Sequence, residues 1–208
     1  MSSESASEHL QVIRTLMERS AYYRRALAPM LCLSGAIGLA GALAACVLKI
    51  ATHQYFVLFW NCLGILALIG SYFLARKQAL KDSEPFWSAP ARRVTQALFP
   101  PFLTGVFFSL VFGMDSVEPA TNLWMLVSGW MICYGCGLHS AGFFTPKGVR
   151  WLGLMFVATG IGFYLLASRI PSLQTVEICH YMMGLFFGAG HLLCAGYIWA
   201  SERRKNAL

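Results

Sequence analysis

Histidine is the side chain of this sequence whose type and spacing could do chemistry in an apolar setting. His139 and His191 lie inside two apolar stretches, and His53 and His180 lie near the ends of two stretches. Counting about 1.5 Å of rise per residue places His139 and His191 at a similar depth, and the other two at a second depth. Neutral imidazole is a common axial ligand of haem iron. One hypothesis is therefore that the four histidines are ligands for two haems stacked across a membrane.

The small residues beside these histidines permit a second interpretation. His180 and His191 are eleven residues apart, which puts them within about 20° of each other on an ideal helix. Gly184, Gly188 and Ala195 share that broad face, so a flat cofactor could lie against it. The arrangement resembles the general plan of b-type cytochromes, although their paired histidines lie farther apart along a helix. The alternative is that each histidine hydrogen-bonds a neighbouring helix and that the small residues permit close packing.

A metal site is a further hypothesis for the same region. The spacing Glu177-x-x-His180 puts a carboxylate and an imidazole on one helical face, as in carboxylate-bridged metal sites. His53, Asp115 and Glu118 come from the other connections on that side. The competing interpretation is a solvated helix start, where the negative charge of Glu177 is favourable beside the helix N-terminus.

Cysteine and catalytic motifs add little chemistry. Cys133-x-x-Cys136-x-x-His139 offers soft ligands for copper or zinc, but the three side chains spread over roughly 120° of a helix, which favours core packing. The seven cysteines form an odd, unclustered set that does not predict a disulfide framework. The metalloprotease, nucleophile-elbow, P-loop and dinucleotide motifs are all missing. The sequence therefore does not predict an enzyme.

The elements that position these residues are apolar helices. Hydrophobic residues make up 57% of the 208 residues and charged residues only 12%, far from the balance of a soluble domain. The apolar residues gather in runs of about 20, the length that crosses a bilayer as a helix. We predict an all-α membrane protein with six transmembrane helices in three hairpins. The spans are about 27–48, 54–75, 94–114, 121–144, 149–168 and 177–200.

The segments outside this bundle (27–200) are short. Residues 1–26 have helical periodicity with a basic side and predict an amphipathic helix on the cytoplasmic face or in the headgroup plane. Residues 201–208 form a basic tail, and the charged connection at 76–93 is expected in water. The adjacent Pro100 and Pro101 should kink or divide the third span.

The positive charges predict an orientation. All but Lys49 and Arg169 of the 16 lysines and arginines fall in segments on one side of the predicted spans, and the side rich in positive charge is normally cytoplasmic. We therefore expect both termini in the cytoplasm. The net charge of +7 fits anionic lipid headgroups, and without a basic patch interleaved with aromatic residues it does not predict nucleic-acid binding.

Residues 13–29, IRTLMERSAYYRRALAP, carry one resemblance. Together with the first span, this segment resembles uncharacterised bacterial multi-pass membrane proteins that open with a Met-Glu-Arg-Ser helix. The resemblance implies a bacterial inner (cytoplasmic) membrane and implies no activity.

We expect a non-catalytic subunit or partner-binding component that associates through helix packing, with the bilayer and a membrane-protein partner or a second copy as its partners. The alternatives are a haem- or metal-binding electron-transfer protein, and a small-molecule or lipid transporter with a pocket beside Pro100–Pro101. We expect no bound cofactor, with haem as the alternative.

Overall fold

The protein is an all-helical bundle. The computed structural model describes residues 26–81, 83, 86–114 and 123–206, and no strand occurs among them. The first helix covers Ala26–Val47, and α2 (His53–Lys81), α3 (Ala89–Met114), α4 (Leu123–Ala141) and α5 (Lys147–Ala167) follow it. After the short turn η1 (Pro171–Leu173), the last span comprises α6 (Val176–Met183), η2 (Gly184–Gly190) and α7 (His191–Asn206). The predicted helix at 1–26 lies outside the described residues, apart from Ala26.

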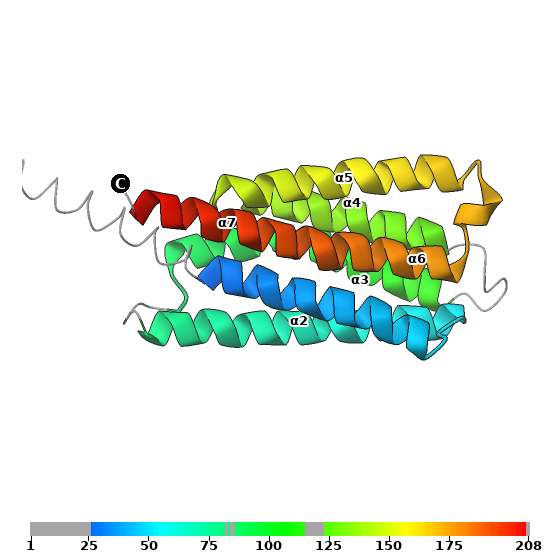
Figure 1. Ribbon diagram of the computed structural model, residues 1–208, viewed down its shortest axis with the longest axis horizontal. Helices are drawn as coiled ribbons and strands as arrows, with labels where there is room; N and C mark the ends of the chain where they lie inside the picture. Colours follow the sequence, from blue (N-terminus) through cyan, green and yellow to red (C-terminus); the bar gives the residue numbers. More distant parts are fainter. Residues whose placement is uncertain (1–25, 82, 84–85, 115–122, 207–208) are drawn as a thin grey trace, which may run out of the picture.

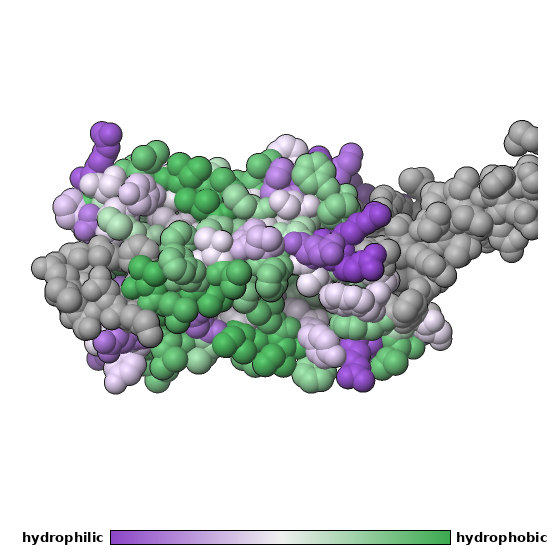
Figure 2. Space-filling model, turned by 180° about the vertical axis from the view of Figure 1, so that it is seen from behind, coloured by the Kyte–Doolittle hydropathy of each residue, from purple (hydrophilic) through white to green (hydrophobic). Residues whose placement is uncertain are grey.

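Five of these helices are long and apolar enough to cross a membrane: the first helix, α2, α3, α5 and the continuous last span. α4 has 19 residues and runs beside them. Figure 2 shows a hydrophobic band across the middle of one face, with hydrophilic residues gathered towards the two ends of the bundle. The prediction of an all-α chain with several helices apolar enough to span a membrane is therefore confirmed, and the sixth span and the three-hairpin arrangement stay predictions.

The helices run side by side along the long axis of the bundle (Figure 1). α3 packs on α2 and α4, and α5 packs on α4 and α7. The first helix contacts α2, where a Cβ at Gly41 would meet Trp60 and Leu63. The first helix also contacts the last span, where a Cβ at Gly38 would lie 2.8 Å from the backbone of Phe187 and Gly188. Small residues allow this approach between helices.

In the middle of the chain, two helices are more continuous than the predicted spans. α2 continues to Lys81 instead of ending near residue 75, because the segment RKQALK consists of good helix formers that extend the helix beyond the apolar stretch. α3 runs unbroken through Pro100 and Pro101, so the prolines do not divide it. Thr104, one turn further on, donates a side-chain hydrogen bond of 3.0 Å to the Pro100 carbonyl.

The last span contains a π-helical turn that the sequence analysis did not anticipate. Residues Gly184–Gly190, GLFFGAG, form this turn between two α-helical halves. Its three glycines have low α-helical propensity, which makes a departure from the regular helix less costly. The turn lies where the first helix approaches most closely, since a Cβ at Gly188 would be 2.8 Å from the backbone nitrogen of Leu39.

Candidate functional site: the buried histidines

His180 joins the last span to the beginning of α2. The indole N–H of Trp60 donates to its Nδ1 at 3.0 Å, and its Nε2 lies 3.0 Å from the carbonyl oxygen of Ile50. Indole N–H can only donate and a carbonyl can only accept, so the ring is the neutral tautomer with its proton on Nε2. The ring is 3% exposed and lies 4.7 Å from that of Phe56. In this arrangement neither ring nitrogen is free for a metal.

His191 occupies a different environment in the centre of the bundle. It is 1% exposed, and its Nε2 lies 2.7 Å from the hydroxyl of Tyr134 on α4. The ring of Phe156 on α5 lies 5.6 Å away, and that of Phe187 stacks on it at 6.2 Å. Its Nδ1 makes no hydrogen bond of standard geometry. One ring nitrogen is therefore used and the other is buried without a partner.

The π turn explains why these two histidines face different neighbours. Their predicted common face assumed 3.6 residues per turn over all eleven positions. A π turn accommodates an extra residue, and each extra residue rotates the following helix by about 100°. Accordingly, His180 contacts the start of α2, whereas His191 contacts α4 and α5. The predicted common face is therefore wrong, and Gly184 and Gly188 instead face Ala42 and Leu39 of the first helix.

The remaining predicted ligands lie apart from one another or near the helix ends. His139 is half-buried in the last turn of α4, where its ring packs edge-on against Phe143 at 5.4 Å. It follows Tyr134 by five residues, a rise of about 7.5 Å, so it is not opposite His191. Among the described ring contacts and hydrogen bonds, none joins His139 to His191. His53 is buried at the start of α2, one turn before Phe56, which contacts His180.

The described residues do not assemble a metal site of three or more ligands. No group of three His, Cys, Asp or Glu side chains in the described part of the chain is arranged to hold a metal ion. Glu177 is in the first turn of α6, next to the N-cap Thr175, as the solvated helix start predicts. Cys133 is half-buried and Cys136 is exposed on α4. Asp115 and Glu118 lie outside the described residues.

A second polar group, which the sequence analysis missed, joins α2, α3 and α4. The Trp130 indole N–H lies 3.1 Å from the Ser109 hydroxyl and 3.2 Å from the Gly105 carbonyl. Ser109 in turn donates towards the side-chain oxygen of Asn61 at 3.3 Å. The available signal was a set of polar residues at mid-span positions, where lipid offers them no partner. Tyr134 carries the same signal.

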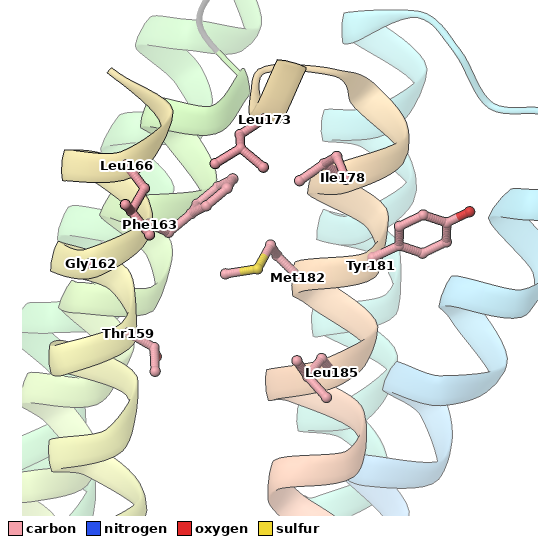
Figure 3. Close-up of a pocket in the computed structure, with 9 residues that line it drawn as sticks. All are labelled: Thr159, Gly162, Phe163, Leu166, Leu173, Ile178, Tyr181, Met182 and Leu185. Carbon is pink, nitrogen blue, oxygen red and sulfur yellow. The ribbon is translucent and has the colours of Figure 1, made fainter. Parts of the chain in front are cut away.

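An apolar groove opens between α5 and the outer half of the last span (Figure 3). It has a volume of about 650 Å³. Its lining is almost entirely apolar, and Phe163, Leu173 and Met182 surround its upper part. None of its lining residues comes from α3. The groove therefore does not coincide with the transport pocket expected beside Pro100–Pro101.

The described geometry thus supports interhelical hydrogen bonding by the buried polar side chains. The ring of His180 bonds Trp60 of α2 and the carbonyl of Ile50 just before that helix. His191 bonds Tyr134 of α4, and Trp130 of α4 bonds Ser109 of α3. No protein-family model matches the chain, and no curated protein or solved structure is significantly similar to it.

Proposed function

We propose that this chain is a non-catalytic membrane protein that acts as a subunit or partner-binding component through packing of its exposed helices. The observation that carries the proposal is the uneven burial of the spans. Only 11% of the apolar window is buried in α2 and in α3, against 28% in the first helix, 33% in α5 and 50% in the last span. α2 and α3 therefore offer the largest apolar faces for another membrane helix.

The middle of α2 is suited to close helix contact. A Cβ at Gly64 would meet no atom within 4 Å, and the neighbouring Ile65 and Leu68 are exposed. Small residues on an exposed face let a second helix approach closely, since association in lipid relies on packing. The occupant is a helix of another membrane protein or of a second copy of the chain.

The polar interior supports a role without catalysis. Haem ligation by all four histidines would require a free ring nitrogen on each, and both nitrogens of His180 are engaged by Trp60 and Ile50. We further propose the bacterial inner membrane as the location, with both termini in the cytoplasm. That orientation places Arg76, Arg93 and Arg150 on the inside, as the positive-inside rule requires.

The test introduces bulk at exposed glycines. Gly64→Trp should abolish co-purification of the partner from membranes in mild detergent, because the new ring occupies the contact face. Gly196→Trp on α7 is the matched control, since a Cβ there also meets no atom within 4 Å, and the partner should be retained. Mass spectrometry of the purified complex distinguishes a second copy from another protein. Equal partner recovery with both variants would contradict the proposed face.

The same preparation tests the redox alternative. An absorption spectrum before and after dithionite reduction should be featureless in the Soret region. A Soret band that shifts on reduction and is lost in His191→Ala would replace this proposal with electron transfer.

A further inference from the structure

Two arginines at one end of the bundle lie over adjacent phenylalanines of the α4–α5 turn. The Arg93 guanidinium of α3 lies 5.8 Å from the centre of the Phe144 ring. The Arg150 guanidinium of α5 lies 5.4 Å from the centre of the Phe143 ring. Both distances are within the range of cation–π attraction. We call these four residues the arginine–phenylalanine clamp.

The turn that carries the clamp is closely packed. A Cβ at Gly142 would lie 2.7 Å from the Cα of Arg150, so the two backbones meet without an intervening side chain. The Thr145 hydroxyl donates to the Ala141 carbonyl at 3.2 Å. His139 also contacts Phe143, edge-on, with the ring centres 5.4 Å apart. The backbone of the turn that carries Phe143 and Phe144 is therefore held by the fold, and their rings lie at its surface.

The surroundings of the clamp are basic and at the same time apolar. Lys147, Arg92 and Arg204 are exposed at this end of the bundle, and Glu202 is the acidic residue among its described side chains. The opposite end has Lys49 and Arg169 as its described cations. Phe143 is 64% exposed and Phe144 is 46% exposed. Exposure of two phenyl rings to water would be unfavourable.

This combination fits the level of the membrane where headgroup phosphates meet acyl chains. Phenylalanine side chains of interfacial segments insert at the boundary between headgroups and acyl chains, and basic sites between spanning helices bind anionic lipid headgroups. The edge of the planar guanidinium can donate two parallel hydrogen bonds to a phosphate while its face lies on an aromatic ring. A free phosphate ion would use the arginines and leave the phenyl rings in water.

We propose that the arginine–phenylalanine clamp binds the phosphodiester group of an anionic phospholipid, with Arg93 and Arg150 on the phosphate and Phe143 and Phe144 against the upper acyl chain. The clamp takes Arg93 from the first turns of α3, but it does not include the middle of α2 around Gly64, and it does not depend on the proposed partner contact.

The experiment measures lipid retention by native mass spectrometry of the full chain in detergent, titrated with phosphatidylglycerol or phosphatidylcholine. The wild type should retain one phosphatidylglycerol in preference to phosphatidylcholine. Each charge removed should weaken that binding by about fivefold, so Arg93→Gln with Arg150→Gln should weaken it roughly 25-fold. The charge-matched control is Lys49→Gln with Arg169→Gln at the opposite end, which should retain wild-type binding.

Two further arms separate charge, ring contact and ion source. Phe143→Leu with Phe144→Leu keeps both charges and should also weaken lipid binding, which covers the case of an arginine variant that fails to fold. Inorganic phosphate at the same concentration as the lipid should not displace it. The proposal is overturned if the double glutamine variant binds like the wild type, if phosphatidylcholine binds equally, or if phosphate displaces the lipid.

Discussion

His180 and His191 belong to the same membrane span, yet their surroundings are opposite in kind. His180 lies one turn from the beginning of α6, and both its nitrogens are hydrogen-bonded. His191 lies at the centre, and only its Nε2 has a partner, the hydroxyl of Tyr134. His180 hydrogen-bonds the segment before α2 through the Ile50 carbonyl, whereas His191 hydrogen-bonds α4 through Tyr134. The π turn between them makes this division of contacts feasible.

The difference teaches that depth and spacing do not by themselves define a shared site. Two residues on one helix face the same way only if every turn between them is regular. In this chain seven π-helical residues intervene, and π turns in helices frequently occur at functional positions. His191 combines such a turn with a buried nitrogen that lacks a partner, so it is the more informative of the two histidines to perturb.

The largest expected effect comes from separating the first helix from the π turn. A leucine at Gly38 would put its Cβ 2.8 Å from the backbone of Phe187 and Gly188, which cannot move aside as a flexible side chain would. We expect Gly38→Leu to lower the free energy of unfolding by about 3 kcal/mol or more, at the upper end for overpacking. Thermal unfolding in detergent measures this loss.

The control for this substitution is Gly64→Leu, for which a Cβ meets no atom within 4 Å. It should change the unfolding temperature little. If the two variants melt at the same temperature, the close packing of the first helix on the π turn is not what holds the His191 region in place.

A smaller effect is expected from His191 itself. Replacing it by alanine leaves a cavity among Tyr134, Phe156 and Phe187 and removes the partner of the Tyr134 hydroxyl. We expect His191→Ala to cost about 2–3 kcal/mol of stability. Tyr134→Phe alone removes only the hydroxyl and should cost about 1 kcal/mol.

Combining the two substitutions tests whether the pair acts as a unit. In the His191→Ala background, Tyr134→Phe should cost nothing more or should regain stability, because the unpaired hydroxyl disappears. Additive losses in the thermal unfolding of the four variants would mean that the hydrogen bond between these two residues contributes nothing measurable.

The sequence predicts the helices better than it predicts their contacts. The first span was expected at 27–48 and is found at Ala26–Val47, since a run of about twenty apolar residues has few alternatives in lipid. Helix ends were less accurate where polar residues continue a helix, as α2 does to Lys81. Apolar content sets which residues lie in the membrane, but helical propensity decides where the helix ends.

The histidine site was predicted only in part, for a reason of geometry. His180 and His191 were named as haem ligands or, alternatively, as groups that hydrogen-bond a neighbouring helix, and both are buried and hydrogen-bonded. Their partners Trp60 and Tyr134 were not predicted, because pairing residues between helices requires knowing which helices are neighbours. A π turn is also invisible to periodicity analysis, which assumes regular turns throughout.

The smallest expected effect concerns His180 and completes the comparison of the two histidines. Trp60→Phe removes the indole donor to Nδ1 and leaves the bond from Nε2 to the Ile50 carbonyl intact. Interhelical hydrogen bonds in membranes contribute about 0.6 kcal/mol on average, so thermal unfolding should show a loss of about 0.5–1 kcal/mol. Trp87→Phe, at an exposed ring outside the core, controls for the change of side chain. A loss as large as that of His191→Ala would show that His180 contributes as much stability as His191. The contrast between a fully hydrogen-bonded histidine near the helix end and a central one with an unpartnered nitrogen would then be wrong.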